Sequence, residues 1–369
     1  MRKRDYRQEL WNQRHAQYVD GRRRASYKKK KSRRRAELLA QAPEASRKPV
    51  HLPGVPKQRY RVTIPLPADL SLARNYEEVM SAVNQMRESA VRRQRGYVDF
   101  RPVRSLGPGA ALVLTAELDR WRRLRRLRMS PLDLDEWDIN VLAQLDEMGL
   151  FEVLDSWQPK AVPRVAVGYQ FIRFRAGVKV AGALAREVRL ALEEVGAEIR
   201  NRAALFGGLT EAMANVLHHA YPHGEKYVAT PIQNQWWMSG AYNSANAQLS
   251  VQFFDQGVGI PTTLPRKHPA ERIKGVLSSL GLPDDDASRI KAAMLLGRSR
   301  TSEPHRGGGL SDIKAFVEAT GKGRLRILSG RGQYIYDTQS GETLLTHREP
   351  LGGTLIEWEV ATTSENPSS

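Results

Sequence analysis

Positive charge is concentrated at the start of this sequence. Because of this concentration, we expect the folded part of the chain to begin after about position 55. Residues 1–50 contain 17 Lys and Arg against 5 Asp and Glu, which is 17 − 5 = +12 of a formal net charge of +18. The densest run, GRRRASYKKKKSRRRAELL, covers residues 21–39. Because like charges at this density repel one another, we expect residues 1–55 to form a basic arm, flexible or helical, outside any core.

The arm suits electrostatic contact with a nucleic acid. Lys and Arg neutralise phosphates, and the arm also offers rings on which bases stack, namely Tyr6, Trp11, Tyr18 and Tyr27. An acidic protein, an anionic membrane surface or a purely solubilising role are the alternatives, and the sequence leaves them open.

The rest of the chain is long and apolar enough for two domains, with 369 residues in all, of which 41% are hydrophobic. The absence of cysteine excludes disulfides, thiolate metal sites and cysteine nucleophiles. No apolar run is long enough to span a membrane, and the charged start lacks the apolar segment of a secretory signal. We therefore expect a cytoplasmic protein with no membrane span, ending in a disordered tail at residues 363–369.

Predicted strands alternate with predicted helices over residues 56–160, which is typical of an α/β domain. Alternating β-branched residues predict a strand at 61–66, and apolar residues three or four apart predict helices at 75–93 and after the SLGPG turn. Within this segment, VDFRPVRSLGPGAALVL and DEMGLFEVL resemble a STAS domain, the fold of anti-sigma-factor antagonists.

The STAS-like resemblance implies a protein partner, with one departure. STAS domains carry an Asp-Ser pair at the start of a helix, where the serine is phosphorylated; this chain has Gly107 and Pro108 there. Since proline has no hydroxyl, we do not expect phosphorylation at that position, although Ser105 is close by. An unrelated small α/β domain is the alternative.

The stretch EAMANVLHHAYPHG carries a carboxylate and a carboxamide on one predicted helix, at about residues 203–220. Glu211 and Asn215 are four residues apart and so share a helix face. Such a glutamate can orient and deprotonate a water molecule, and an asparagine oxygen is a suitable ligand for Mg²⁺.

Two glycine motifs come after that helix in the sequence. In DQGVG, at the end of a predicted strand, Asp255 can accept a hydrogen bond from the exocyclic amine of adenine, while Gly257 and Gly259 let the backbone approach a flat ring. RGGGL opens a predicted helix, where free N–H groups and the helix dipole can hold phosphate oxygens. Strands are predicted at GRLRILSG, GQYIYDT, ETLLTHR and GGTLIEWEV. The last of them begins with GGT, and the hydroxyl of Thr354 is a further candidate contact.

These four blocks, in this order over residues 180–362, resemble the GHKL ATPases (DNA gyrase B, Hsp90, histidine kinases and MutL). The Walker sequence GxxxxGK[ST] is absent. The resemblance implies a domain at 165–362, a two-layer α/β sandwich with helices on one face of a mixed sheet, and a lid at about 260–306. It makes Glu211 the general base and Asn215 the Mg²⁺ ligand. The implied nucleotide contacts are Asn215, His218, Asp255, Gly257, Gly259, Arg306, Gly307, Gly308, Gly309, Leu310 and Thr354.

Three histidines close the helix, and a zinc site is one interpretation of them. His218 and His219 are adjacent on a helix and point about 100° apart, which argues against convergence on one metal ion. His218, three residues after Asn215, is the candidate for contact with the nucleotide. His219, four after Asn215, faces the same way as the Glu–Asn pair, and His223 suits a structural role.

Several functions are compatible with a pocket for ATP and Mg²⁺. We favour a regulatory switch with hydrolysis, acting on protein or nucleic-acid partners. The alternatives are a serine/threonine kinase of the anti-sigma type, acting on a STAS-like partner, and a nucleic-acid-handling ATPase. A sensor histidine kinase is disfavoured because the predicted helix at 181–199 has no histidine. The resemblance also implies an ATP-closed homodimer, and the sequence does not distinguish hydrolysis from phosphate transfer.

Overall fold

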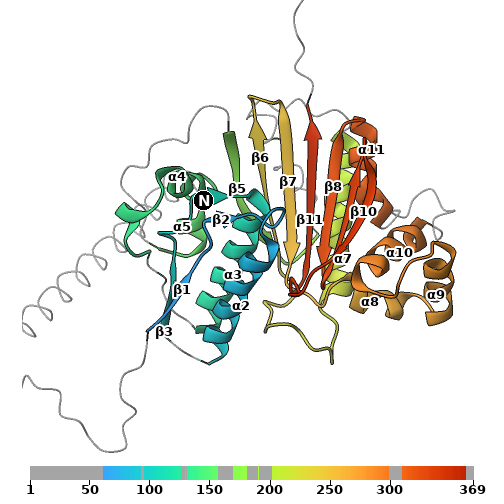
Figure 1. Cartoon of the computed structure of the whole chain (residues 1–369), viewed down its shortest axis with the longest axis horizontal. Coiled ribbons are helices and arrows are strands. Elements are labelled where there is room, and N and C mark those ends of the chain that lie inside the picture. The colour runs from blue at the N-terminus through green and yellow to red at the C-terminus, as the bar shows by residue number, and fades with distance from the viewer. Residues whose placement is uncertain are drawn as a thin grey trace, which may run out of the picture. The chain divides into compact units, whose positions relative to one another are not determined.

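One seven-stranded sheet organises the chain (Figure 1). The computed structural model describes residues 61–92, 95–125, 129, 131–156, 169–180, 190, 202–298 and 310–362. The sheet has the strand order β10-β9-β8-β11-β7-β6-β5. Its strands are β5 (Tyr169–Gly177), β6 (Trp236–Asn243), β7 (Gln248–Asp255), β8 (Gly323–Ser329), β9 (Gly332–Asp337), β10 (Gly341–Thr346) and β11 (Thr354–Ala361).

The sheet is antiparallel throughout, so the expectation of a mixed sheet is wrong. Short turns join β6 to β7, β8 to β9 and β9 to β10, and a chain that turns straight back pairs antiparallel. The strands predicted from GRLRILSG, GQYIYDT, ETLLTHR and GGTLIEWEV are confirmed as β8 to β11.

Two helices cover one side of the sheet, which we call the α7 face. They are α7 (Arg202–Asn215), continued by the π-helical turn Val216–Ala220, and α11 (Leu310–Thr320). Strand side chains that point to this side form one cross-strand row and pack into a shared apolar core with both helices. The row consists of Met238, Phe253, Ile356 and Ile327.

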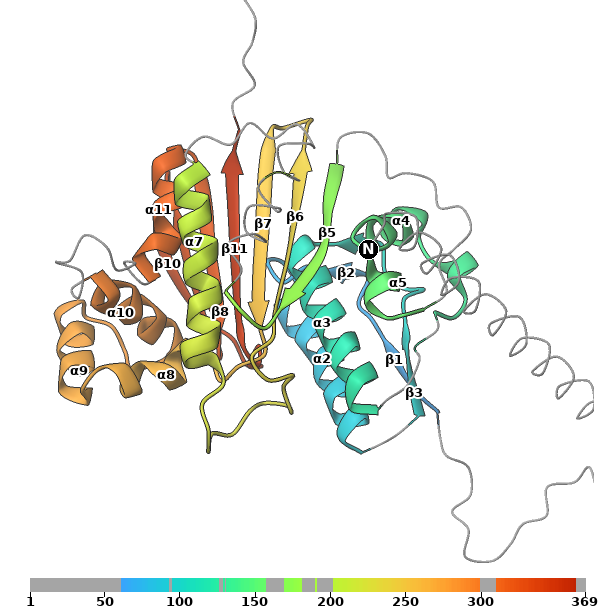
Figure 2. The same ribbon diagram turned by 180° about the vertical axis from the view of Figure 1, so that it is seen from behind.

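In Figure 2 the viewer faces the α7 side, with α7 in front of the sheet. The opposite side, which we call the α3 face, packs against α3 (Pro108–Arg125), which contacts β6 and β7. Because successive strand residues point to opposite faces, the neighbouring cross-strand row packs here. It consists of Trp237, Phe254, Leu355 and Leu328. Helix α3 belongs to residues 61–156, so the molecule has three layers in all, whereas the two layers implied by the resemblance concern residues 165–362 alone. Adjacent apolar pairs in the strands, such as Trp236-Trp237 and Phe253-Phe254, are the sequence signal for this arrangement.

Residues 61–156 build what we call the α3 layer. Its elements are β1 (Arg61–Pro65), β2 (Asp69–Leu70), α2 (Tyr76–Val91), β3 (Arg95–Asp99), β4 (Ser105–Leu106), α3 (Pro108–Arg125), the 3-10 turn Leu134–Glu136, α4 (Ile139–Glu147) and α5 (Leu150–Val153). β1 pairs with β3, and β2 with β4, both in parallel. The layer shares one apolar core with the sheet, and the compact unit runs from Tyr60 to Ser369. The domain boundary near residue 160 stays a prediction.

The start of α3 packs directly on the sheet. Gly109 is buried, and a Cβ there would lie 2.0 Å from Oε1 of Glu357, on β11. The glycine therefore lets the first turn of α3 pack directly against a buried carboxylate of the sheet. In this chain that helix start is part of the core between the layer and the sheet.

The segment predicted as a lid is helical over most of its length. It contains α8 (Ile260–Lys267), α9 (Ala270–Ser279) and α10 (Asp286–Arg298). These helices share a small apolar core that includes Leu264, Leu277 and Leu296. No described helix is long and apolar enough to cross a membrane. The predicted basic arm, the helix at 181–199 apart from Leu190, and the tail lie outside the described residues.

Candidate functional site

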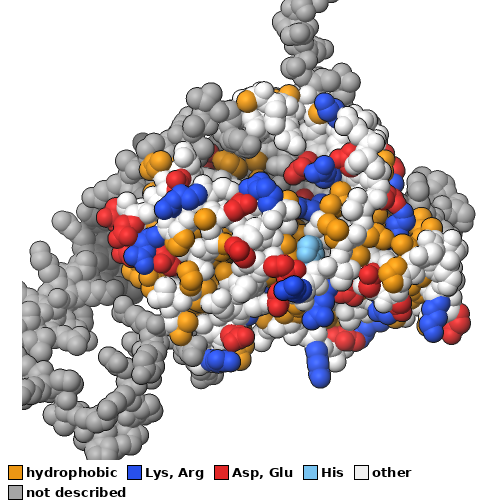
Figure 3. Space-filling view, viewed as in Figure 1, with side chains coloured by type: hydrophobic (Ala, Val, Ile, Leu, Met, Phe, Trp, Pro, Cys, Tyr) orange, Lys and Arg blue, Asp and Glu red, His pale blue; other side chains and the backbone are white. Residues whose placement is uncertain are grey.

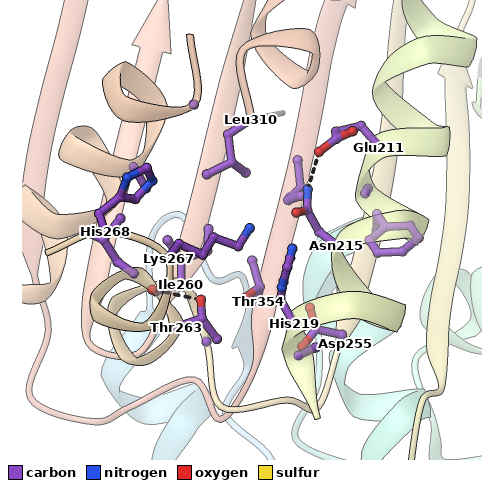
Figure 4. A pocket seen from close by; sticks show the side chains of 18 residues that line it. Glu211, Asn215, His219, Asp255, Ile260, Thr263, Lys267, His268, Leu310 and Thr354 are labelled. Carbon is purple, nitrogen blue, oxygen red and sulfur yellow. Dashed lines mark hydrogen bonds between the residues drawn. The ribbon is translucent and has the colours of Figure 1, made fainter. Parts of the chain in front are cut away.

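A cavity that is open to solvent, with about 880 Å³ of empty space including its mouth, lies between the α7 face of the sheet and helices α7, α8, α10 and α11 (Figure 4). Several residues singled out in the sequence line it, although they come from distant parts of the chain. They are Glu211, Asn215, Asp255, Gly259, Leu310 and Thr354.

Glu211 and Asn215 form a hydrogen-bonded pair on the cavity wall. Nδ2 of Asn215 donates to Oε1 of Glu211 over 2.9 Å, which leaves the carboxamide oxygen of Asn215 for another partner. Burial raises the pKa of Glu211, and the hydrogen bond from Asn215 opposes that rise. A carboxylate with a raised pKa, held in one orientation, has the properties of a general base.

The π-helical turn after Asn215 decides which histidine reaches the cavity. Turns of this kind are rare and are frequent at functional sites. His219 lines the cavity, whereas His218 is exposed and lies outside the lining. The pKa of His219 is lowered to about 4, mainly by burial and also by the charges of Lys267 and His218. His219 therefore presents a neutral imidazole at pH 7, in the position that the sequence motif assigned to His218.

Asp255 ends β7 at the bottom of the cavity and is 5% exposed. The backbone N–H of Gly257 donates to its Oδ1 over 2.8 Å. Burial raises the pKa of Asp255 to about 7, against the backbone hydrogen bonds from Gly257 and Thr354. Thr354 lies beside it in the register of β7 and β11, and its hydroxyl is 3.0 Å from that of Ser329.

The two glycines of DQGVG have different surroundings. Gly259 lines the cavity with a φ of +86°, a conformation that favours glycine. Gly257 lies outside the lining: a Cβ there would be 2.4 Å from the carbonyl oxygen of Ala220. Its requirement for glycine comes from packing on the π-helical turn. Arg306, Gly307, Gly308 and Gly309 lie outside the described residues.

The wall opposite α7 supplies residues that the sequence motifs did not include. α8 presents Ile260, Leu264 and Lys267 at helical spacing, and His268 comes directly after them. The spacing of these residues in the sequence, i, i+4 and i+7, could have identified this face of α8. Lys267 is the one Lys or Arg among the described lining residues, and its charge acts on both Glu211 and His219. Figure 4 shows it extending into the cavity.

The helices that form this wall of the cavity are hydrogen-bonded to the β8–β10 end of the sheet through the start of α10. The Asp286 carboxylate accepts a hydrogen bond from the N–H of Arg331 over 2.8 Å, and Asp285 accepts one from the hydroxyl of Thr346 over 3.1 Å. The helices of the predicted lid are therefore tied to the β8–β10 hairpins.

No protein-family model matches this sequence, and no curated protein is significantly similar to it. Across the described residues, no group of three or more His, Asp or Glu side chains is placed to hold a metal ion. The hard oxygen atoms of Glu211 and Asn215 fit Mg²⁺, which is commonly bound through one or two protein side chains and completed by substrate phosphates and water.

Proposed function

We propose that this cavity binds an adenine nucleotide with Mg²⁺ and hydrolyses ATP, as the GHKL-like order of motifs implies. The observation that carries the proposal is convergence. Five residues chosen from sequence motifs come from a helix, two strands and the turn after β7, and they line one cavity: Glu211, Asn215, Asp255, Gly259 and Thr354.

The adenine end is assigned to Asp255. Its carboxylate accepts a hydrogen bond from the exocyclic amine, and the neighbouring hydroxyl of Thr354 adds a second polar contact. Ile260, Leu264 and Ile356 line the same cavity and offer apolar surface to a flat ring. Few polar groups in a mostly apolar pocket are typical of small-molecule sites.

The phosphate end is assigned to the Glu211–Asn215 pair and Lys267. Mg²⁺, when bound, neutralises phosphate charge, and the oxygen of Asn215 is its protein ligand. Lys267 supplies positive charge from the opposite wall. In hydrolysis the oxygen of water bonds to the γ-phosphorus, the bond from that phosphorus to the bridging oxygen of ADP breaks, and Glu211 accepts the water proton.

Calorimetry tests the binding directly. Purified protein titrated with ATP, ADP and a non-hydrolysable ATP analogue in Mg²⁺ is expected to give binding heat that EDTA weakens. Absence of heat with all three nucleotides would refute the proposal. Incubation with γ-labelled ATP then separates hydrolysis, which releases labelled phosphate, from transfer, which labels protein.

The surroundings of Ser105 favour a switch over phosphorylation of the chain's own STAS-like segment. The Ser105 hydroxyl donates to Oδ1 of Asp69 over 2.6 Å and accepts from Arg74 over 3.1 Å, so it is already engaged. Kinase activity on a separate STAS-like partner is the second candidate, and label transfer to that partner is its test.

A nucleic-acid role depends on the basic arm. On the face shown in Figure 3, Lys and Arg side chains of the described residues are interspersed with Asp and Glu, so this face presents no uniformly basic surface. Stimulation of ATP hydrolysis by DNA or RNA, lost on deletion of residues 1–45, is the expected sign of that role.

A further inference from the structure

The two chain segments that bring Asp255 and Thr354 to the cavity are both held from the α3 face. One is the turn after β7, which begins at Gln256. The other is the loop from β10 to β11, which ends at Gly353. Each has hydrogen bonds to a helix of the α3 layer.

Gln256 holds the first segment. Its side chain is 2% exposed, and its Nε2 donates to the carbonyl oxygen of Ala116, on α3, over 3.1 Å. Its backbone N–H donates to the Tyr221 hydroxyl over 3.0 Å, and that hydroxyl donates to the carbonyl oxygen of Gln235 over 2.6 Å. The residue directly after Asp255 is thus fixed by α3 through its side chain and by Tyr221 through its backbone.

Arg87 of α2 holds the second segment. Its Nη2 donates to the carbonyl oxygen of Leu351 over 2.6 Å and to Glu117 over 2.7 Å. A Cβ on Gly352, where φ is +77°, would lie 2.9 Å from the guanidinium. A Cβ on Gly353 would lie 1.8 Å from the carbonyl oxygen of Asp255. Contact is therefore continuous from Arg87 through the glycine pair to the strand end that carries Asp255.

More contacts join α2 to the same loop. The Tyr76 hydroxyl donates to the carbonyl oxygen of Glu349 over 2.9 Å, and the Tyr76 ring stacks on His347 at 3.7 Å between centroids. Glu77 accepts a hydrogen bond from the backbone N–H of Arg348 over 2.9 Å. The loop is therefore held at several points before it reaches Thr354.

The charges at this contact are buried. Arg87, Glu117 and Arg120 form an ion-pair cluster in which each residue is 5% exposed or less. Burial lowers the pKa of Arg87 to about 10 and that of Arg120 to about 9. Since a buried ion pair often stabilises a protein no more than apolar residues of the same volume would, the cluster suggests a role in fixing geometry.

We propose that the α3 layer sets the adenine end of the nucleotide site, with Gln256 and Arg87 as its positioning residues. This inference rests on the proposed function. A nucleotide that binds at Asp255 and Thr354 is expected to stabilise the contacts of the α3 layer. Coupling between two sites is reciprocal, so a partner that moves α2 or α3 changes the affinity for nucleotide by the same factor as the nucleotide changes the affinity for that partner.

The test compares Gln256→Met with Gln144→Met. Gln144 makes the same kind of hydrogen bond, from Nε2 to the carbonyl oxygen of Leu106 over 3.1 Å, but inside the α3 layer and away from the cavity lining. Both substitutions remove one side-chain-to-backbone bond, so we expect similar losses of thermal stability. Only Gln256→Met is expected to speed amide exchange at residues 257–260 in the free protein. It is also expected to weaken ATP binding by about fivefold or more, which is the lower end of the typical coupling between two sites.

The outcomes separate this inference from the proposed function. If Gln256→Met lowers the melting temperature as Gln144→Met does, but leaves exchange at 257–260 and ATP affinity unchanged, the bond is only structural and the inference is wrong. If the wild type binds no nucleotide, the proposed function fails, and the exchange measurement still decides whether Gln256 positions the turn. In the wild type, ATP is expected to slow exchange in α2 and α3 more than in α4; equal protection would overturn the coupling.

Discussion

The two faces of the seven-stranded sheet are built from the same strands and do different work. On the α3 face the strands are covered by a helical layer and share its core. On the α7 face the helices enclose a cavity at one end. At the end of β7 the difference is visible in consecutive residues: Phe254 packs into the α3-face core, Asp255 lines the cavity, and Gln256 is bonded to α3.

Polar side chains on the two faces of the sheet have different surroundings. On the α3 face several of them pair with one another: Arg326 donates to Glu357 over 2.6 Å, and Ser239 donates to Gln252 over 3.2 Å. On the α7 face the cavity gathers Glu211 and Asp255, whose pKa values are raised mainly by burial. Burial also raises the pKa of Glu357 on the α3 face, but that carboxylate is held by Arg326, whereas Glu211 and Asp255 line a cavity that a ligand can enter.

The largest expected effect comes from the cavity side. Replacing Glu211 by Gln is expected to reduce ATP turnover by about 10²–10⁴-fold, because a positioned general base is lost, with ATP affinity nearly unchanged. Steady-state phosphate release and calorimetry measure the two effects. Glu318→Gln, on α11 and paired with Lys314, is the matched control; equal turnover in both variants would remove Glu211 as the base.

The α3 face is expected to contribute stability. Phe254 is fully buried there, and its replacement by Ala is expected to lower the free energy of unfolding by about 3–5 kcal/mol, since it leaves a cavity in a packed core. Leu345→Ala, on edge strand β10 and 45% exposed, is the control, with an expected loss below about 1 kcal/mol. Urea unfolding measures both, and similar losses would contradict the assignment of the core to this face.

The pH dependence of stability should have opposite signs in the two regions. Asp255 has a pKa raised from 3.8 to about 7, so it stays protonated in the folded protein over a range where the unfolded chain ionises. Stability is therefore lost as pH rises from about 4 to about 7. Asp255→Asn should remove that slope, with a relative gain of about 2–4 kcal/mol at pH 8.

Asp99, in the α3 layer, is the counterpart. The hydrogen bond from Arg101 is the main cause of its lowered pKa, so its contribution to stability is present above its unfolded pKa and is lost as pH falls through the folded value. Asp99→Asn should therefore destabilise at neutral pH and flatten the acid side of the profile. Melting temperatures from pH 3 to pH 8 measure both variants, and slopes of the same sign would contradict these assignments.

The sequence predicted most of the elements whose periodicity is regular. Helix α2 and strands β8 to β11 follow their apolar spacing closely. Strand β6, WWMSGAYN, was missed because its Ser, Gly and Asn interrupt the alternation, and because a strand buried on both faces lacks a period of two. The packing of residues 61–156 on the second face of the sheet was also missed, although apolar neighbours in a strand indicate cover on both faces.

Most of the described residues that the motifs predicted for the site line the cavity, whereas Gly257 and His218 do not. Asp255 and Thr354 follow from strand ends, whose pairing is fixed by register. His218 and His219 exchange places at the lining because a π-helical turn comes after Asn215, and no local pattern predicted that turn. Lys267 was missed because the segment around it was interpreted as a lid by its composition rather than as an amphipathic helix.

Lys267 tests whether a positive charge in the cavity, rather than the charge of the whole surface, contributes to ATP binding. Lys267→Gln is expected to weaken ATP binding by about 10-fold, because a charge-assisted contact to phosphate contributes about 1.5–3 kcal/mol, and to leave adenosine binding unchanged. Arg266→Gln, next in the chain and paired with Glu225 outside the cavity lining, controls for net charge. Calorimetry at two salt concentrations makes the comparison. If both variants weaken ATP equally, the effect is that of overall charge; if Lys267→Gln weakens adenosine as well, the lysine acts on the shape of the cavity instead of on phosphate.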